Sequence, residues 1–161
     1  MAGPRFVDHP LGMEIEVLAR SVEQRTLAIW AAECAESALP LFEKGRPEDS
    51  RPRQAIEKLR DWIGTGEFRM NDIRRASLNA HAAARSAPEN SSARFAARAC
   101  GQAVATAHVK AHSIGAAWYA AKAVWAEGGG VNDVGAEREW QLHMLMRLSR
   151  RHQNNDGASG R

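Results

Sequence analysis

The sequence predicts an all-α protein, built as a compact bundle of about six alanine-rich helices. Alanine accounts for 30 of the 161 residues, and it combines the highest helix propensity with a side chain small enough for close helix packing. No segment alternates apolar and polar residues as a half-buried strand does. The length suits a domain with its own hydrophobic core. We expect an N-terminal arm at 1–20, a single helical domain at 21–152 and a disordered tail at 153–161.

The arm is expected to be extended or turned, because Pro10 disfavours helical backbone at His9. A first helix is predicted to begin at Ser21, since a serine followed three residues later by a glutamine matches a capping box. Its helical apolar spacing continues to residue 42, although Pro40 is expected to kink or end it.

The second helix is predicted over 50–63, with Pro52 tolerated in its first turn and with Gly64 and Gly66 ending it. Pro88 closes the next helical pattern, and three consecutive glycines separate the last two helices. The remaining helices are expected over residues 71–87, 92–111, 113–127 and 133–151, with the middle two of these joined directly or through a bend.

Charge and cysteine content limit the classes of function. Lys and Arg number 22 against 19 acidic residues, and this mild excess favours a solvated surface over a nucleic-acid interface. Cys34 and Cys100 stand in apolar helical contexts, which predicts buried free thiols in a reducing compartment. The first 15 residues lack a secretory signal and no long apolar run is present, so we expect a cytoplasmic protein with no membrane partner.

Three histidines form the first candidate site. His108 and His112 are four residues apart, which would place both on one face of the predicted fourth helix, beside Gly101 and Gly115. A hairpin with the third helix would bring His81 to that pair. Three imidazoles can hold Zn²⁺ with an open fourth position. The alternative is that these histidines are hydrogen-bonded contacts between helices or partly exposed residues.

Carboxylates and tryptophans form the second candidate site. Glu33 and Glu36 share the predicted first helix with Trp30. A carboxylate beside a histidine can fix its tautomer or tune its pKa, so the candidate catalytic groups are Glu33, Glu36 and His81. The alternative is that the acids form surface ion pairs and the tryptophans fill the core. The candidate ligand-binding residues are Trp30, Trp118 and Arg51.

Two further patterns concern macromolecular partners. One is a row of arginines that could meet phosphate or an acidic partner, although a solvated face is the preferred interpretation and no nucleic-acid motif accompanies the row. Its members are Arg74, Arg75, Arg85, Arg94 and Arg98. The other is an apolar stripe on the last helix, which must be buried either within the chain or in a homo-oligomer. Its members are Trp140, Met144, Leu145 and Leu148.

Several segments together resemble a known family. They are AIWAAECAE at 28–36, DSRPRQAIE at 49–57, AHAAAR at 80–85 and GQAVATAH at 101–108. Their order is similar to the immunity-five-like family of bacterial polymorphic toxin systems, over about residues 4–145. The resemblance implies a small helical protein that neutralises a toxin by binding it, and it carries over no catalytic residue. The alternative function is a small-molecule-binding protein or enzyme with a buried His/Glu/Trp pocket, with zinc as its candidate cofactor.

Overall fold

The computed structural model describes residues 4–158, and within them eight α-helices and no strand, which confirms the all-α prediction. The helices are α1 (Leu11–Ala19), α2 (Gln24–Ala38), α3 (Pro40–Glu43), α4 (Arg51–Thr65), α5 (Met70–Ser86), α6 (Ser92–Ala105), α7 (His112–Ala126) and α8 (Val131–Ala158). Two of them, α1 and the single-turn α3, exceed the six that were predicted. Helix α4 ends at Gly66, whose left-handed backbone (φ 71°) suits a residue without a side chain.

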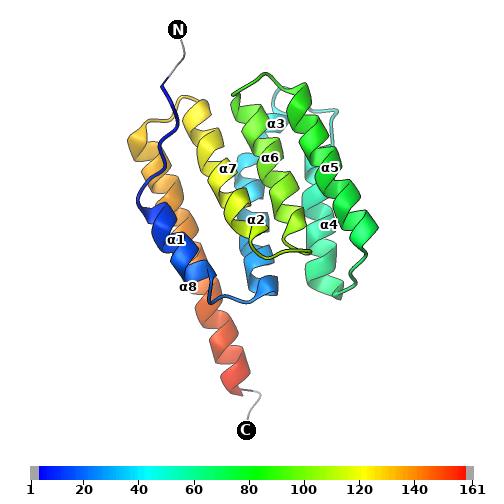
Figure 1. Ribbon diagram of the computed structural model, residues 1–161, viewed down its shortest axis with the longest axis vertical. Coiled ribbons are helices and arrows are strands. Elements are labelled where there is room, and N and C mark those ends of the chain that lie inside the picture. The colour runs from blue at the N-terminus through cyan, green and yellow to red at the C-terminus, as the bar shows by residue number, and fades with distance from the viewer. Residues whose placement is uncertain (1–3, 159–161) are drawn as a thin grey trace.

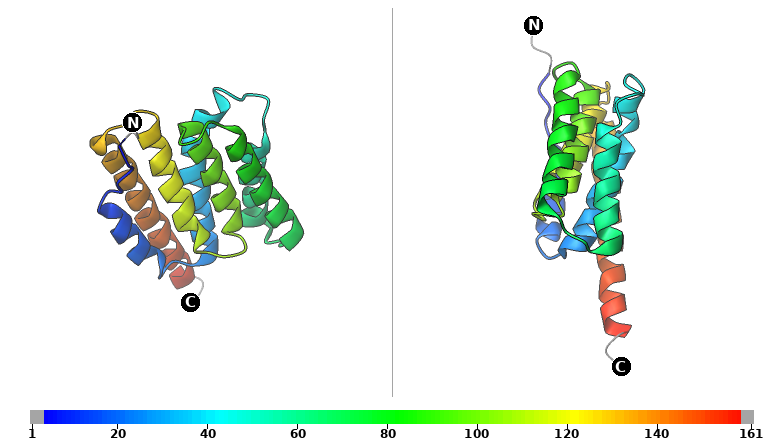
Figure 2. Two further views of the ribbon diagram at one scale, coloured as in Figure 1. Left: turned by 45° about the horizontal axis from the view of Figure 1, so that its top comes forward. Right: turned by 90° about the vertical axis from the view of Figure 1, so that its right-hand side faces the viewer.

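The helices form two layers (Figures 1 and 2). Helices α5, α6 and α7 lie side by side in one layer, and α4, α2 and α8 lie behind them in the other. The central helix α2 packs against both α6 and α7, and α1 lies beside α8 and α7. None of the helices within residues 4–158 combines the length and apolar character needed to cross a membrane.

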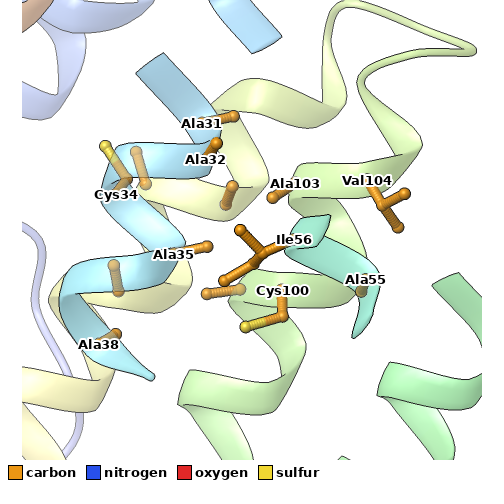
Figure 3. Close-up of a cluster of buried hydrophobic side chains, with 14 of the residues drawn as sticks. Ala31, Ala32, Cys34, Ala35, Ala38, Ala55, Ile56, Cys100, Ala103 and Val104 are labelled. Atoms are coloured by element: carbon orange, nitrogen blue, oxygen red, sulfur yellow. The ribbon is translucent and has the colours of Figure 1, made fainter. Parts of the chain in front are cut away.

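Alanine fills most of the space between the layers. Ala31 and Ala35 of α2 face Ala103 of α6 without any exposed surface, and Ile56 of α4 lies among them (Figure 3). Such small contacts let helix axes approach closely. The alanines without exposed surface in these layers include Ala28, Ala32, Ala55, Ala80, Ala83, Ala96, Ala97, Ala99, Ala116, Ala117, Ala120 and Ala123.

The two cysteines belong to this interior. Cys34 and Cys100 are both fully buried and free, which confirms the prediction of buried thiols. Burial raises the pKa of each thiol well above its ordinary value. Since only the thiolate is a good nucleophile, neither sulfur is placed to react.

The N-terminal segment differs from the expected arm, because residues 11–19 form α1. Ile15 and Ala19 are buried against the rest of the chain, so packing against α8 and α7 stabilises this short helix. The capping box predicted at Ser21 is wrong, because its hydroxyl donates to the carbonyl of Leu18 at the end of α1. Helix α2 begins one turn later, where Glu23 accepts the backbone N–H groups of residues 25 and 26.

The last helix is longer than predicted. It continues to Ala158, whereas the sequence analysis ended it near residue 151 and expected disorder from residue 153; residues 159–161 of that tail lie outside the described part of the chain. Its apolar stripe is divided, because Met144 and Leu145 are buried in this chain's own core while Trp140 is 39% exposed. Two members of the stripe therefore need no second subunit to cover them.

Candidate functional site

His108 and His112 do not share a helix, so that part of the prediction is wrong. Helix α6 ends at Ala105, His108 lies in the following turn, and His112 is the first residue of α7. Most backbone hydrogen bonds in the turn span three residues, as from His108 N to the carbonyl of Ala105 (3.0 Å). The chain therefore reverses direction between the two histidines.

The reversal is fixed by side chains distant in the sequence. Carbonyls at the end of α6 have no partner within the helix, and Gln24 of α2 donates its amide to those of Thr106 (2.9 Å) and Ala107 (3.0 Å). In the same turn Lys110 donates to the carbonyl of Val22 (3.3 Å). These contacts replace the helical bonds that a continuous α6 would have made.

His81 of α5 packs over Gly101 of α6. A Cβ atom at position 101 would lie 2.7 Å from Nε2 of His81, so the ring occupies space that only a glycine leaves free. Arg98 contacts Nδ1 at 3.0 Å, and because a guanidinium only donates, His81 carries its proton on Nε2. Burial, and then the positive charge of Arg98, lower the pKa of His81 to about 4. The ring is therefore neutral at pH 7.

His112 makes a similar contact one helix further on. Its Nδ1 lies 2.8 Å from Oε1 of Gln102, and since that oxygen accepts, the imidazole donates. A Cβ atom at Gly115 would lie 2.9 Å from the Gln102 oxygen, so this glycine admits the amide. Burial lowers the pKa of His112, with a smaller effect from His108. The hydrogen-bonded-contact interpretation thus describes both His81 and His112.

The geometry gives the zinc hypothesis no support. His108 is exposed and stacks on Phe68, with 6.3 Å between ring centroids. Over residues 4–158, no group of three or more His, Cys, Asp or Glu side chains is arranged to hold a metal ion. His81, His108 and His112 lie on three different elements, and each has a contact that does not involve a metal.

The candidate carboxylates and His81 have different partners. Glu33 and Glu36 of α2 both pair with Arg60 of α4, at 3.0 Å for Glu33. His81, in contrast, contacts α6. The acid–base set proposed from the sequence is therefore not brought together in the structure.

The three candidate ligand-binding residues are also separated. Trp30 has no exposed surface and donates its indole N–H to the carbonyl of Gln141 in α8 (2.8 Å), so it belongs to the core. Arg51 pairs with Asp49 at the start of α4 (2.6 Å). Arg51 also lines a pocket, of about 290 Å³, and Trp118 lines a separate one, of about 460 Å³. The other residues that line the Trp118 pocket are Pro4, Arg5, Phe6, Asn90, Lys122 and Trp125.

A buried polar network joins the N-terminal segment to α8, and the sequence analysis did not find it. Arg138 is 3% exposed and donates to both oxygens of Asp8 (2.9 and 2.7 Å) and to Gln141 (2.9 Å). Gln141 in turn donates to Glu137 and to the carbonyl of Ala117 in α7. Burial raises the pKa of Glu137. The polar groups of this network form hydrogen bonds with one another, which is typical of a structural role.

Charge is divided unequally between the two layers. Residues 73–126, which contain nearly all of α5 and the whole of α6 and α7, carry seven Lys and Arg but a single acidic residue, Glu89. The rest of the chain carries 15 Lys and Arg and 18 acidic residues. The layer that faces the viewer in Figure 1 is therefore strongly basic, and the remainder of the molecule is slightly acidic.

Five of these cations lie on the outer side of the layer, away from its buried helix faces: Arg74 and Arg85 are exposed, and the other three are half-buried. We call them the basic face: Arg74, Arg85, Arg94, Arg98 and Lys122. None of the five forms an ion pair with any residue in the described range 4–158. The cations of α4 differ in this respect, because Arg53 pairs with Glu43 and Arg60 with Glu33 and Glu36.

Three members of the basic face are held in place without a carboxylate. Arg94 donates to the carbonyl of Arg85 in the last turn of α5 (3.2 Å) and to that of Ala87 in the α5–α6 loop (3.1 Å). Arg98 rests on His81. Lys122 lies over the ring of Phe95, at 4.5 Å from its centroid, and over that of Trp118 at 4.7 Å. These contacts fix the cations while leaving their charge uncompensated.

Comparison with known families decides the assignment. The family described as "Imm-5 like putative immunity protein" matches residues 18–148. The chain belongs to this family. In this Imm-5 like protein the matched range begins in α1 and ends in α8, so it contains both layers and the basic face. No curated protein and no solved structure matches the chain.

Proposed function

We propose that this Imm-5 like protein is an immunity protein that neutralises a partner toxin by binding it directly. The observation that carries the proposal is the family match over residues 18–148, which spans most of the chain. Binding a protein partner requires a stable surface rather than an assembled catalytic site, and the alanine-packed fold supplies such a surface.

The arrangement of polar groups favours this function over catalysis. Glu33 and Glu36 share Arg60 as their ion-pair partner, and His81 is neutral and held by Arg98. Within residues 4–158 no buried side-chain nitrogen or oxygen lacks a hydrogen-bond partner. An enzyme site commonly leaves such groups available for substrate, whereas here they stabilise contacts between helices.

The test uses the toxin polypeptide encoded beside this chain's own gene. Cells that express the toxin alone are expected to stop growing, and co-expression of this chain is expected to restore growth. The purified proteins are then expected to form a complex in isothermal titration calorimetry. Ala96→Arg serves as a control, because Ala96 has no exposed surface and a charge there should prevent folding.

Two results would argue against the proposal. One is that the folded chain fails to bind the toxin in calorimetry and fails to restore growth. The other is that the Ala96→Arg variant protects as well as the wild type, since protection would then not require the folded protein.

A further inference from the structure

We propose that the basic face is the toxin-docking surface and that the toxin presents carboxylates to it. This inference rests on the proposed function, and it adds the location of the contact and the chemistry of the partner. The basic face is the set Arg74, Arg85, Arg94, Arg98 and Lys122, defined above.

Uncompensated charge is the first argument. Five cations on neighbouring helices repel one another, and none of them has a carboxylate within 4.0 Å among the residues that the structure describes. Outside residues 73–126, carboxylates meet six of the 14 Lys and Arg side chains that the structure describes, including all four cations of α4, as Glu43 meets Arg53. A protein surface with complementary negative charge would supply the missing partners and would also accelerate encounter.

Pre-positioning is the second argument. Arg94 and Arg98 already have donors fixed by the α5–α6 loop and by His81, and Lys122 is held over two aromatic rings. Ordering a long side chain on binding costs conformational entropy. Cations that are ordered beforehand avoid part of that cost, and the planar guanidinium suits paired contacts with a carboxylate.

The size of the layer is the third argument. Helices α5, α6 and α7 contain 17, 14 and 15 residues, which makes each about 21–26 Å long at 1.5 Å per residue. Three helices at 8–10 Å spacing give a width of about 25–30 Å. The resulting flat area of about 600 Å² is close to the roughly 800 Å² of accessible surface that a partner buries in a stable complex.

The composition of the face favours a protein over a nucleic acid. Leu78 is 57% exposed between Arg74 and Arg85, and Tyr119 lies half-exposed near Lys122. Protein interfaces combine arginine and aromatic residues with apolar contacts in this way. Single-stranded nucleic acid is instead bound by successive stacked bases on exposed aromatic rings.

The test compares two doubly substituted variants of the full chain. Arg74→Glu/Arg85→Glu reverses two cations whose side chains make no hydrogen bond or ion pair within residues 4–158. The control, Arg147→Glu/Arg150→Glu, makes the same change of net charge on exposed residues of α8 in the other layer. Circular dichroism and thermal unfolding verify that both variants fold.

Binding to the toxin polypeptide is measured by surface plasmon resonance at 50 and 300 mM NaCl. Arg74→Glu/Arg85→Glu is expected to lower the association rate about 10-fold or more at low salt and to raise Kd about 100-fold. The control is expected to stay within about twofold to threefold of the wild type. Carbodiimide coupling is expected to join Lys122 to an Asp or Glu of the toxin.

Three outcomes would overturn the inference. If the wild type binds and both variants bind equally well, the proposed function stands but the docking surface lies elsewhere. If the wild type binds a 20-nucleotide RNA more tightly than the toxin and Arg74→Glu/Arg85→Glu loses that binding, the face is a nucleic-acid interface. If the wild type does not bind the toxin, the proposed function fails and this inference fails with it.

Discussion

Gly101 decides how closely α5 can approach α6. Alanine would normally be the better residue at a helical position, by about 1 kcal/mol. At this position its Cβ would lie 2.7 Å from Nε2 of His81, and that ring is held in place by Arg98. The steric effect therefore outweighs the helix propensity.

Gly101→Ala is expected to lower the free energy of unfolding by about 1–2 kcal/mol, because overpacking exceeds the gain in helix propensity. In the background of His81→Ala the same change should raise it by up to about 1 kcal/mol, since the obstructing ring is absent. Urea denaturation of the four proteins of this cycle measures both values. Equal effects in the two backgrounds would show that the ring does not limit the packing.

His81 also makes stability depend on pH. Its pKa is about 4 in the folded protein, whereas the ordinary value is 6.5, so between these values the unfolded chain binds more protons than the folded chain. Stability from this group is therefore complete above about pH 6.5 and is lost as the pH falls toward 4.

The expected loss is about 1–2 kcal/mol between pH 6.5 and pH 4, after allowing for the partial exposure of the ring. The measurement is the urea midpoint across this range for the wild type and for His81→Asn, which cannot titrate. Identical slopes for His81→Asn and wild type would contradict the assignment.

At the scale of elements, the N-terminal segment and α8 depend on one buried contact. Arg138 is almost fully buried and binds Asp8, 130 residues away in the sequence, while Gly12 of α1 packs against the same pair. Removing one partner of such a pair leaves the other without compensation.

Arg138→Met is expected to lower the free energy of unfolding by about 2–4 kcal/mol, toward the lower end of the range for buried pairs because Asp8 keeps some exposure. Hydrogen exchange should show α1 losing protection before the other helices. The matched control is Arg147→Met on the exposed side of α8, with an expected effect below about 0.5 kcal/mol. Unchanged exchange in α1 would show that apolar packing alone holds it.

The sequence correctly predicted those helix ends that are marked by a residue at the end itself. Gly66 ends α4 as expected, and Ser91 caps α6 directly before residue 92, where that helix was expected to begin. The break after Ala105 was missed because alanine conceals it: the helical pattern continues, and the contacts that stop the helix come from Gln24 and Lys110. Helix α1 was missed for the same kind of reason, since its stability comes from packing.

The sequence predicted less of the candidate site than of the helices. The row from Arg74 to Arg98 was noticed, but Lys122 was not grouped with it, because only the fold places α7 beside α6. A charge count by segment would have found the shortage of acidic residues between 73 and 126. The histidine and glutamate pattern suggested one pocket, whereas the side chains have separate partners on different helices.

At the scale of the whole molecule, repulsion among the cations of the basic face should lower the free energy of unfolding. Arg74→Gln/Arg85→Gln is expected to raise the free energy of unfolding by roughly 0.2–0.5 kcal/mol at 20 mM NaCl, because it relieves repulsion. The gain should disappear at 500 mM NaCl, where the charges are screened. Urea denaturation at both salt concentrations measures it.

Arg60→Gln is the matched control, because it removes a cation that has two carboxylate partners. Its expected effect has the opposite sign, a loss of up to about 1 kcal/mol at low salt. A loss of stability in Arg74→Gln/Arg85→Gln, similar to that of the control, would show that these arginines do have compensating contacts.

The alanine interior has a consequence for the electric field outside the protein. Helices separated by alanine can lie about 8 Å apart rather than the 10 Å that larger side chains impose. The same five cations are then spread over a strip roughly a fifth narrower, so the density of positive charge on that side rises in proportion. Enlarging the interior would dilute this charge without altering any surface residue. The smallest side chains in the core therefore help to set how strong the positive potential is close to this surface, while ionic strength sets how far it extends.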